Sequence, residues 1–318
     1  MIPSGDVRIV VPPQLSATRL AWLKGGQRVS VCLPARNEAA TIGPICEVIA
    51  DELMGEHGLV DELLVLDDGS TDGTAAVAIA AGADVISAAD VLPELGPRRG
   101  KGQVLWASVA ASTGDIVVWC DSDLIGFDAS YVKGLVAPLL EDHTVELVKG
   151  YYLRQQDELG RGGGRTTELM ARPVLSRYFP EVATFRQPLG GECASRRSLL
   201  EQLPFVESYG VEVGLLIDAA RLVGVDALVQ VDLGVRTHRH RSLLDLSEQA
   251  AEILTVVLDR AGVEPRGDAT LLRGDGKVVD TERRELPPML SLDAYRESRA
   301  TGIPLGRVDE AGEATSHA

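Results

Sequence analysis

The fold is decided by the stretch VSVCLPARNE (residues 29–38), an apolar run that ends abruptly in polar residues. The same pattern returns as LLVLDDGS (residues 63–70) and as IVVWCDSD (residues 116–123). Each apolar part has the composition of a buried β-strand. In an open parallel sheet, ligands bind beyond the carboxyl ends of the strands. We therefore expect the three polar ends to line one crevice and to offer at least four carboxylates to one ligand.

The third polar end, Asp121-Ser122-Asp123, gives this crevice a candidate chemistry. Carboxylates gathered at one edge repel each other unless a cation joins them. One aspartate of such a pair can bind a ribose and the other a divalent cation, which keeps positions for phosphate oxygens. An isolated acidic pair is more often a turn or a helix cap, but the two further polar ends favour function. The sequence therefore predicts a metal-dependent site for a nucleotide diphosphate.

Strands and helices alternate from residue 29 to about residue 150. Apolar spacing and capping residues predict helices over 41–54, 72–81 and 103–112, and further strands over 84–87 and 145–148. This alternation is typical of an α/β fold with a doubly wound, mostly parallel sheet. Beyond residue 150 we expect a helix over 165–171 interrupted by Pro173, a strand over 192–194, a helix over 211–222, a strand over 227–235 and a helix over 243–260.

These elements divide the chain into four regions. Residues 1–28 form an irregular N-terminal arm, residues 29–150 the nucleotide-binding region and residues 151–261 a second region with a different pattern. Residues 262–318 are a polar, irregular extension. Its last dozen residues are expected to be disordered.

Composition limits the possible partners. The chain has 318 residues and a net charge of −16, from 47 acidic and 31 basic residues. That field repels nucleic acids and anionic membranes, although an excess of surface acid also serves solubility. The four cysteines form no C-x-x-C pair, so neither a structural zinc nor disulfides are indicated. No signal peptide and no apolar run of about 20 residues is found, which predicts a soluble, cytoplasmic protein.

The first two strand ends supply candidate nucleotide contacts. A carboxylate at Asp68 could accept the imide N–H of uracil or the N1–H and amino groups of guanine, or could simply belong to a turn that caps the next helix. Pro34, Arg36 and Glu38 lie where a base or its phosphate would pass. Arg36 could equally be a solvated loop charge.

Two glycine-containing turns are candidate anion sites. GPRRGKG (residues 96–102) fails the P-loop spacing, but a basic turn that opens a helix can hold a pyrophosphate through backbone N–H groups and Lys101. In GGGRTT (residues 162–167), Gly164 frees the backbone, Arg165 offers a guanidinium fork and Thr167 a hydroxyl, which suits a phosphate or carboxylate. The alternatives are an ordinary helix start and a flexible linker.

Two further residues could carry chemistry. Glu212 opens a predicted helix and is either a general base or a first-turn acid favoured by the helix dipole. Asp218 lies six residues further on and so on another face. His238 follows a predicted strand and could be a structural residue, but the acidic site favours metal ligation.

With these residues in view, the chain resembles a glycosyltransferase of the GT-A fold, which is Rossmann-like. More narrowly it is similar, over about residues 29–260, to the glucosyl-3-phosphoglycerate synthase family, which includes related mannosyl-3-phosphoglycerate synthases. The stretches that carry the resemblance are GGGRTTELMARP (162–173), QPLGGE (187–192), YGVEVGLLID (209–218) and DLGVRTH (232–238).

The resemblance implies retaining transfer of a sugar from a nucleotide sugar to the 2-hydroxyl of 3-phosphoglycerate. It makes residues 29–150 the nucleotide-sugar-binding region and residues 151–261 the acceptor-binding region. It implies that Asp123 and His238 bind a divalent metal, expected to be Mg²⁺, with Mn²⁺ or Co²⁺ as alternatives. It also implies a homodimer. The implied donor residues are Pro34, Arg36, Glu38, Asp68, Lys101, Asp121 and Ser122; the acceptor residues are Gly164, Arg165 and Thr167; Glu212 and Asp123 are the catalytic residues.

Several alternatives stay open at this stage. The donor is UDP-glucose or GDP-glucose, or GDP-mannose in a mannosyl-3-phosphoglycerate synthase. Glu212 either acts as a base or orients the acceptor, since front-face attack needs no full deprotonation. A nucleotidyltransferase would show a glycine-rich N-terminal signature ending in Arg and Lys, which is missing. A non-catalytic nucleotide-sugar-binding protein is the more distant alternative.

Overall fold

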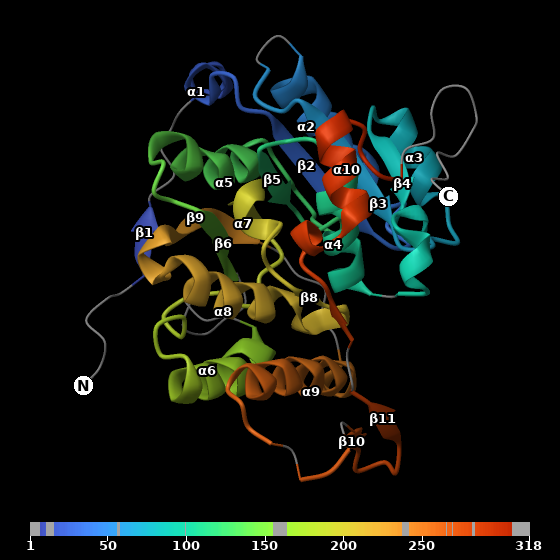
Figure 1. The fold of residues 1–318 in the computed structure, drawn as a ribbon, viewed down its shortest axis with the longest axis vertical. Helices are drawn as coiled ribbons and strands as arrows, with labels where there is room; N and C mark the ends of the chain where they lie inside the picture. Colours follow the sequence, from blue (N-terminus) through green and yellow to red (C-terminus); the bar gives the residue numbers. More distant parts are fainter. Residues whose placement is uncertain are drawn as a thin grey trace.

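The computed structural model describes residues 7–10, 16–55, 58–98, 100–154, 164–236, 242–264, 266–268, 270–281 and 284–306. Within these residues the centre of the fold is an eight-stranded sheet with strand order β1-β9-β6-β7-β5-β2-β3-β4 (Figure 1). Its strands are β1 (Arg8–Val10), β2 (Val29–Ala35), β3 (Glu62–Asp67), β4 (Asp84–Ser87), β5 (Ile116–Trp119), β6 (Leu147–Arg154), β7 (Cys193–Arg196) and β9 (Leu228–Arg236). All neighbours pair in parallel except β7, which is antiparallel to β5 and β6. The expected mostly parallel α/β sheet is confirmed.

Helices cover both faces of this sheet. Successive residues of β2 point to opposite sides: Val31 and Leu33 belong to one core cluster and Cys32 to the other. Because both faces are covered, the strands read as nearly continuous apolar runs. The first cluster lies under α1 (Ala17–Lys24), α2 (Ile42–Ile49), α3 (Thr74–Ala80) and α5 (Ser130–Glu141). The second lies under α4 (Lys101–Ala111), α6 (Arg172–Tyr178), α7 (Arg197–Leu200), α8 (Val211–Val223), α9 (Leu243–Arg260) and α10 (Asp293–Thr301).

Two predicted helices contain a wider π turn. Ala50–Met54 follows α2 as such a turn, and Thr167–Ala171 precedes α6. In the second turn the N–H of Arg172 donates to the carbonyl of Thr167, and Pro173 then lies in the first turn of α6, where its missing N–H is tolerated. The expected interruption at Pro173 is therefore wrong, because the wider turn lets the helix continue to Tyr178.

Both ends of the chain are more regular than the sequence indicates. In the arm expected to be irregular, β1 pairs with β9 and α1 packs on α5. Beyond residue 262 the structure has the hairpin β10 (Thr270–Leu272) with β11 (Val278–Asp280), the pair β8 (Phe205–Val206) with β12 (Glu285–Leu286), and α10. These elements owe their order to tertiary contacts, which composition does not reveal. Residues 307–318, where disorder is expected, lie outside the described residues.

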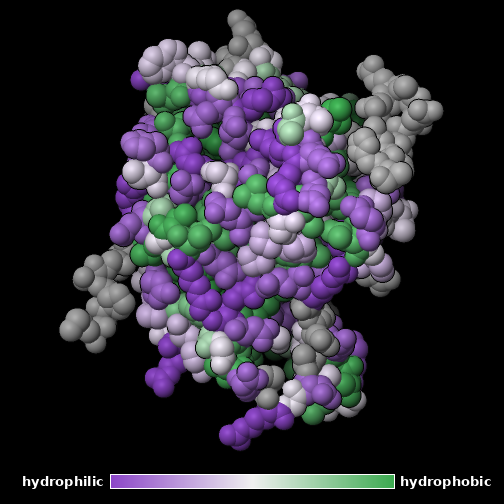
Figure 2. Space-filling model, viewed as in Figure 1, coloured by the Kyte–Doolittle hydropathy of each residue, from purple (hydrophilic) through white to green (hydrophobic). Residues whose placement is uncertain are grey.

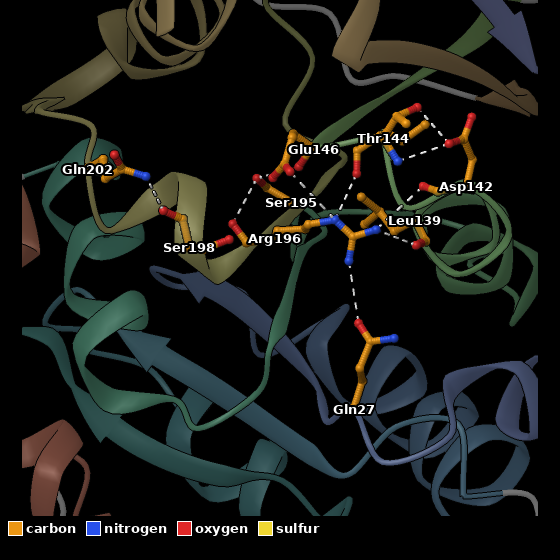
Figure 3. Close-up of polar contacts among 10 residues, drawn as sticks. Gln27, Leu139, Asp142, Thr144, Glu146, Ser195, Arg196, Ser198 and Gln202 are labelled. Carbon is orange, nitrogen blue, oxygen red and sulfur yellow. Dashed lines mark hydrogen bonds and ion pairs between the residues drawn. The ribbon is translucent and has the colours of Figure 1, made fainter. Parts of the chain in front are cut away.

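The antiparallel strand β7 is fixed at its far end by Arg196. The guanidinium donates to the carbonyls of Leu139 at 2.7 Å and Val145 at 2.9 Å, and to the amide oxygen of Gln27 at 3.4 Å (Figure 3). A cation favours the carbonyl end of a helix, here α5. Arg196 thus joins β7, the end of α5 and the chain before β2.

The surface is polar and the cysteines are buried. On the face shown in Figure 2, hydrophilic residues predominate and hydrophobic ones gather in separate small groups. All four cysteines are free and buried, and burial raises the pKa of the Cys32 and Cys46 thiols to about 12. No helix in the described part of the chain is long and apolar enough to cross a membrane.

The C-terminal helix α10 is held by the buried ring of Tyr295. The Tyr295 hydroxyl donates to Glu201 Oε1 at 2.5 Å and accepts from Arg197 at 3.3 Å. We expect Tyr295→Phe to lower the free energy of unfolding by about 1–3 kcal/mol, since the buried Arg197 and the half-buried Glu201 each lose a partner. Chemical denaturation measures this loss. Tyr178→Phe, whose ring is 43% exposed, is the matched control and is expected to change little. Equal effects of the two changes would contradict the role of Tyr295.

Candidate active site

The carboxyl ends of β2, β3 and β5 meet at one edge of the sheet. Ala35 lies opposite Asp67, and the N–H of Asp68 donates to the carbonyl of Ala35 at 2.9 Å. On the other side of β2, the Ser122 hydroxyl donates to the carbonyl of Pro34 at 2.7 Å. The three polar ends therefore line one edge, as the sequence predicts. Ser122 stabilises this edge of the fold, since its own carbonyl also accepts a hydrogen bond from the Thr41 hydroxyl at 2.7 Å.

Asn37, which the sequence analysis did not single out, links two of these ends. Its backbone has φ of 56°, in the left-handed region that asparagine tolerates better than most residues. Its N–H donates to the Ser70 hydroxyl at 2.9 Å, and its Oδ1 accepts the N–H of Thr71 at 2.8 Å. The Glu38 N–H donates to the Thr74 hydroxyl at 2.8 Å. These bonds fix the end of β2 to the turn that follows β3. In the sequence, the dipeptide Asn37-Glu38 directly after β2 was the available signal for this link.

Asp68 faces the first strand end and the start of α4. Its carboxylate lies 3.4 Å from the Arg36 guanidinium and also accepts the N–H of Gly100. The Arg36 side chain is 61% exposed and the Asp68 side chain 17%, so the pair is open to solvent on one side. Burial raises the pKa of Asp68 above its ordinary value, although Arg36 and the Gly100 N–H oppose the shift.

Lys101 joins the two regions of the chain. Its ammonium lies 2.7 Å from Asp121 Oδ1, at the end of β5, and 2.7 Å from Glu212 Oε1, in the first turn of α8. Burial alone would lower the pKa of Lys101, but the attraction of the two carboxylates outweighs it and raises that pKa well above the ordinary value. The three charges sum to −1. Part of the repulsion that the sequence analysis assigned to a metal is therefore already relieved by Lys101 and Arg36.

Glu212 and Asp218 point to different sides of α8, as their spacing predicts. The Glu212 side chain is 10% exposed and reaches Lys101, whereas Asp218 accepts from Arg260 of α9 at 2.9 Å. Glu212 is thus more than a first-turn acid. It contacts Lys101, which also contacts Asp121, although Glu212 lies in the second region of the chain.

Gly191 is a site residue that sequence reasoning missed. A Cβ atom there would lie 2.2 Å from Asp121 Oδ1 and 2.6 Å from Lys101 Nζ, far inside contact distance. The double glycine in the stretch QPLGGE was the available signal. Only glycine lets the backbone approach this ion pair so closely.

The structure describes the candidate acceptor turn from Gly164 onward. Thr167 is buried, Arg165 is exposed, and the Gly164 carbonyl accepts the N–H of Glu168 at 3.0 Å. Arg172 pairs with Glu168 at 2.9 Å and donates to the carbonyl of Ala183 at 2.7 Å, which fixes the start of this helix. The remaining glycines of the turn and His238 lie outside the described residues, so these assignments stay predictions.

The residues at the end of β5 suit a divalent cation by their chemistry. Asp123 is half-buried and follows Ser122, whose two hydrogen bonds fix the turn. Carboxylate oxygens are the ligands that Mg²⁺ and Mn²⁺ prefer. Among the residues that the structure describes, no group of three His, Cys, Asp or Glu side chains is close enough to hold a metal ion. His238, the second metal ligand that the resemblance implies, lies outside the described residues, so the metal site stays a prediction.

The close approach of Gly191 to the Lys101–Asp121 ion pair can be tested by chemical labelling. The raised pKa and the two carboxylates should make Lys101 react with amine-directed reagents far more slowly than the exposed Lys277, by about tenfold for each unit of pKa. Gly191→Ala should speed labelling of Lys101, because the new methyl group pushes the pair apart. Peptide mapping by mass spectrometry measures both rates.

Gly73→Ala is the matched control, since a Cβ at Gly73 meets nothing within 4 Å. Labelling of Lys101 that stays equally slow in both alanine variants would contradict the close approach of Gly191.

The comparisons with known proteins agree with this geometry. Residues 30–202 match the model of glycosyl transferase family 2. The glucosyl-3-phosphoglycerate synthase of Mycolicibacterium smegmatis is 46% identical over 290 residues, which cover 88% of this chain and 95% of that protein. The Petrotoga mobilis enzyme of the same name is 39% identical over 287 residues, covering 85% and 88%.

A solved structure gives the same result. The crystal structure of the Mycobacterium tuberculosis glucosyl-3-phosphoglycerate synthase, in complex with Mn²⁺, UDP-glucose and phosphoglyceric acid, is 42% identical with a TM-score of 0.83, covering 92% of this chain and 99% of that one. The chain therefore belongs to glycosyl transferase family 2 and, within it, to the glucosyl-3-phosphoglycerate synthases.

Proposed function

We propose that this protein transfers glucose from UDP-glucose to the 2-hydroxyl of 3-phosphoglycerate, with retention of anomeric configuration. The observation that carries the proposal is the match, over 92% of the chain, to a relative solved with UDP-glucose, Mn²⁺ and phosphoglyceric acid. The same match favours UDP-glucose over GDP-glucose and over the GDP-mannose of a mannosyl-3-phosphoglycerate synthase. A homodimer and a cytoplasmic location stay predictions.

The donor would lie along the edge formed by the ends of β2, β3 and β5. Asp68 accepts the imide N–H of uracil, and Arg36 beside it stays free on its open side to meet a base or phosphate. Pro34 and Glu38 border the same edge through the contacts of β2 with Ser122 and Thr74. Asp121 and Ser122 bind the ribose side, and Lys101 reaches the diphosphate from the start of α4.

Asp123 and His238 would hold the divalent cation. When bound, that cation stabilises the negative charge of the departing diphosphate. We expect Mg²⁺ to serve in the cell, although the solved relative holds Mn²⁺. Gly164, Arg165 and Thr167 would bind the phosphate and carboxylate of the acceptor through backbone N–H groups, a guanidinium and a hydroxyl.

The position of Glu212 favours orientation over proton removal. One of its oxygens is held by the Lys101 ammonium at 2.7 Å, so the carboxylate is fixed in one orientation. In front-face attack the bond from the sugar C1 to the diphosphate oxygen breaks while C1 bonds to the acceptor 2-oxygen. The hydroxyl proton passes to the departing diphosphate. Glu212 then orients the sugar or the attacking hydroxyl.

A donor panel tests the proposal. Purified protein is incubated with 3-phosphoglycerate and UDP-glucose, GDP-glucose or GDP-mannose, with and without Mg²⁺. We expect transfer from UDP-glucose that depends on the cation, with an α-type anomeric coupling in the product. Transfer from none of the donors would favour a non-catalytic nucleotide-sugar-binding protein, and a β-type coupling would exclude retention.

Asp123→Ala should abolish most of the turnover. Loss of one carboxylate ligand is expected to lower kcat with UDP-glucose by at least about 100-fold, because the cation would no longer be held against the diphosphate. Steady-state kinetics in Mg²⁺ and in Mn²⁺ measure the loss. Asp226→Ala removes an exposed carboxylate before β9 and is the matched control. Full turnover in Asp123→Ala would rule out this metal site.

Asp68 should make donor binding sensitive to acid. Its pKa is raised by burial, so it becomes neutral at a higher pH than an ordinary aspartate as the pH falls. The neutral carboxyl is a weaker acceptor for the uracil N–H, and the KM for UDP-glucose should therefore rise as the pH is lowered. Asp68→Asn should raise this KM about tenfold at neutral pH and remove the acid-dependent part.

Asp72→Asn, at an exposed aspartate whose pKa is lowered by its hydrogen bond from the Thr74 hydroxyl, should keep the pH profile of the unaltered protein. If Asp68→Asn keeps that profile as well, Asp68 does not contact the base.

A further inference from the structure

Residues 186–192, which we call the glycine turn, form a buried irregular segment between α6 and β7. Most of its residues are buried, and at its end Gly191 lies against Asp121 and Lys101. Buried backbone N–H and C=O groups need hydrogen-bond partners, and an irregular turn cannot supply them from a helix or sheet pattern. Backbone groups provide some of these partners: the Gly190 N–H donates to the carbonyl of Gln187 at 3.0 Å, and the Glu192 carbonyl accepts the N–H of Gly150 at 2.9 Å. Side chains provide others.

Three buried polar side chains hold the glycine turn. Gln230 Oε1 accepts the N–H of Arg186 at 2.7 Å. Gln187 Nε2 donates to the carbonyl of Tyr152 at 2.7 Å. The Lys149 ammonium donates to the carbonyl of Gly190, next to Gly191. Lys149 is only 3% exposed, which is rare for a lysine.

The row of the sheet that carries Lys149 explains why a lysine is buried there. Lys149 of β6 lies opposite Gln230 of β9 on one side and Cys193 of β7 on the other. The same row continues through Trp119 to Cys32, which together with Cys193 belong to one apolar cluster. The row becomes polar at Lys149 and Gln230, both of which bond the glycine turn. The two polar residues of this row are therefore the two that bond the glycine turn.

The pairing of β6 with β7 places Lys149 near Gly191. Burial raises the pKa of the Cys193 thiol to about 11, and Lys149 opposes this shift while Glu212 and Glu192 add to it. Lys149 lies opposite Cys193 by strand register, and Cys193 is two residues after Gly191.

We propose that Lys149 is a positioning residue of this enzyme. Its ammonium holds the Gly190 carbonyl, so that Gly191 stays against the Lys101–Asp121 pair and Asp121 keeps the place from which it binds the donor. Lys149 touches neither donor nor acceptor in this role. The assignment rests on the proposed function, because Asp121 is a donor residue only there.

The test replaces Lys149 by methionine, which has a similar length and no donor. Lys24→Met is the matched control: Lys24 is also buried, at 7% exposure, and also donates to a glycine carbonyl, that of Gly58, but belongs to α1 on the other face of the sheet. Both variants are expected to lose stability. Only Lys149→Met should affect the glycine turn.

Two measurements are made on both variants. Hydrogen exchange of peptides covering residues 186–193 should be about tenfold faster in Lys149→Met and unchanged in Lys24→Met. The KM for UDP-glucose should rise about tenfold in Lys149→Met, with the KM for 3-phosphoglycerate within about twofold, a difference that general destabilisation would not produce. If both variants give the same exchange in this turn, the proposal is wrong.

A double-mutant cycle tests the route of the effect. If Lys149 acts through the glycine turn, Lys149→Met should add little to the loss of kcat/KM caused by Gly191→Ala, whereas additive losses would contradict that route. If Lys149→Met does not fold, the same two measurements are made on Lys149→Gln. The shorter glutamine amide should give smaller increases in the exchange rate of the glycine turn and in the KM for UDP-glucose. Absence of glucose transfer by the unaltered protein would overturn the proposed function alone, because the exchange measurement needs no activity.

Discussion

The candidate active site depends on one ammonium group shared by two carboxylates. Lys101 begins α4, Asp121 ends β5 and Glu212 begins α8, and the 2.7 Å contacts bring these three elements to one point. Breaking either contact would leave a charge in a mostly buried place, which costs far more than a surface ion pair contributes. This contact is also where residues 29–150 meet the second region of the chain, so the two regions are aligned by a charge interaction.

The approach to this group is shaped by backbone. Gly191 comes so close to Asp121 and Lys101 that a side chain there would have to displace one of them. Gly102, one residue after Lys101, packs equally tightly: a Cβ there would lie 1.8 Å from the carbonyl of Val206. Glycine on both sides lets α4, the glycine turn and the segment before α8 pack around one lysine. Rigid backbone around a reacting centre reduces the reorganisation that the reaction requires.

The two ends of the parallel strands have different surroundings: structural contacts lie at the amino ends and the candidate site lies at the carboxyl ends. At the amino ends of the parallel strands, Arg196 and Arg197 bond carbonyls of α5 and α4, and Tyr295 of α10 adds to this group. At the carboxyl ends, polar side chains meet at the crevice instead. The open α/β sheet favours this division, because its parallel strands, all except β7, point their carboxyl ends at one edge. The C-terminal segment thus stabilises the sheet at the end away from the candidate site.

The sequence by itself determined the strands of the central sheet other than β1, the edge proposed to bind ligands and the acidic pair at the end of β5, because strand period and polar strand ends are local features. The residues Asp68, Lys101, Asp121 and Glu212 could be named from such local signals. Tertiary structure alone decided three contacts. Lys101 pairs with Glu212, Gly191 lies against Lys101 and Asp121, and Lys149 donates to the carbonyl of Gly190. These contacts join residues far apart in the chain, and their partners are chosen by how helices and turns pack on the sheet, which no local pattern records.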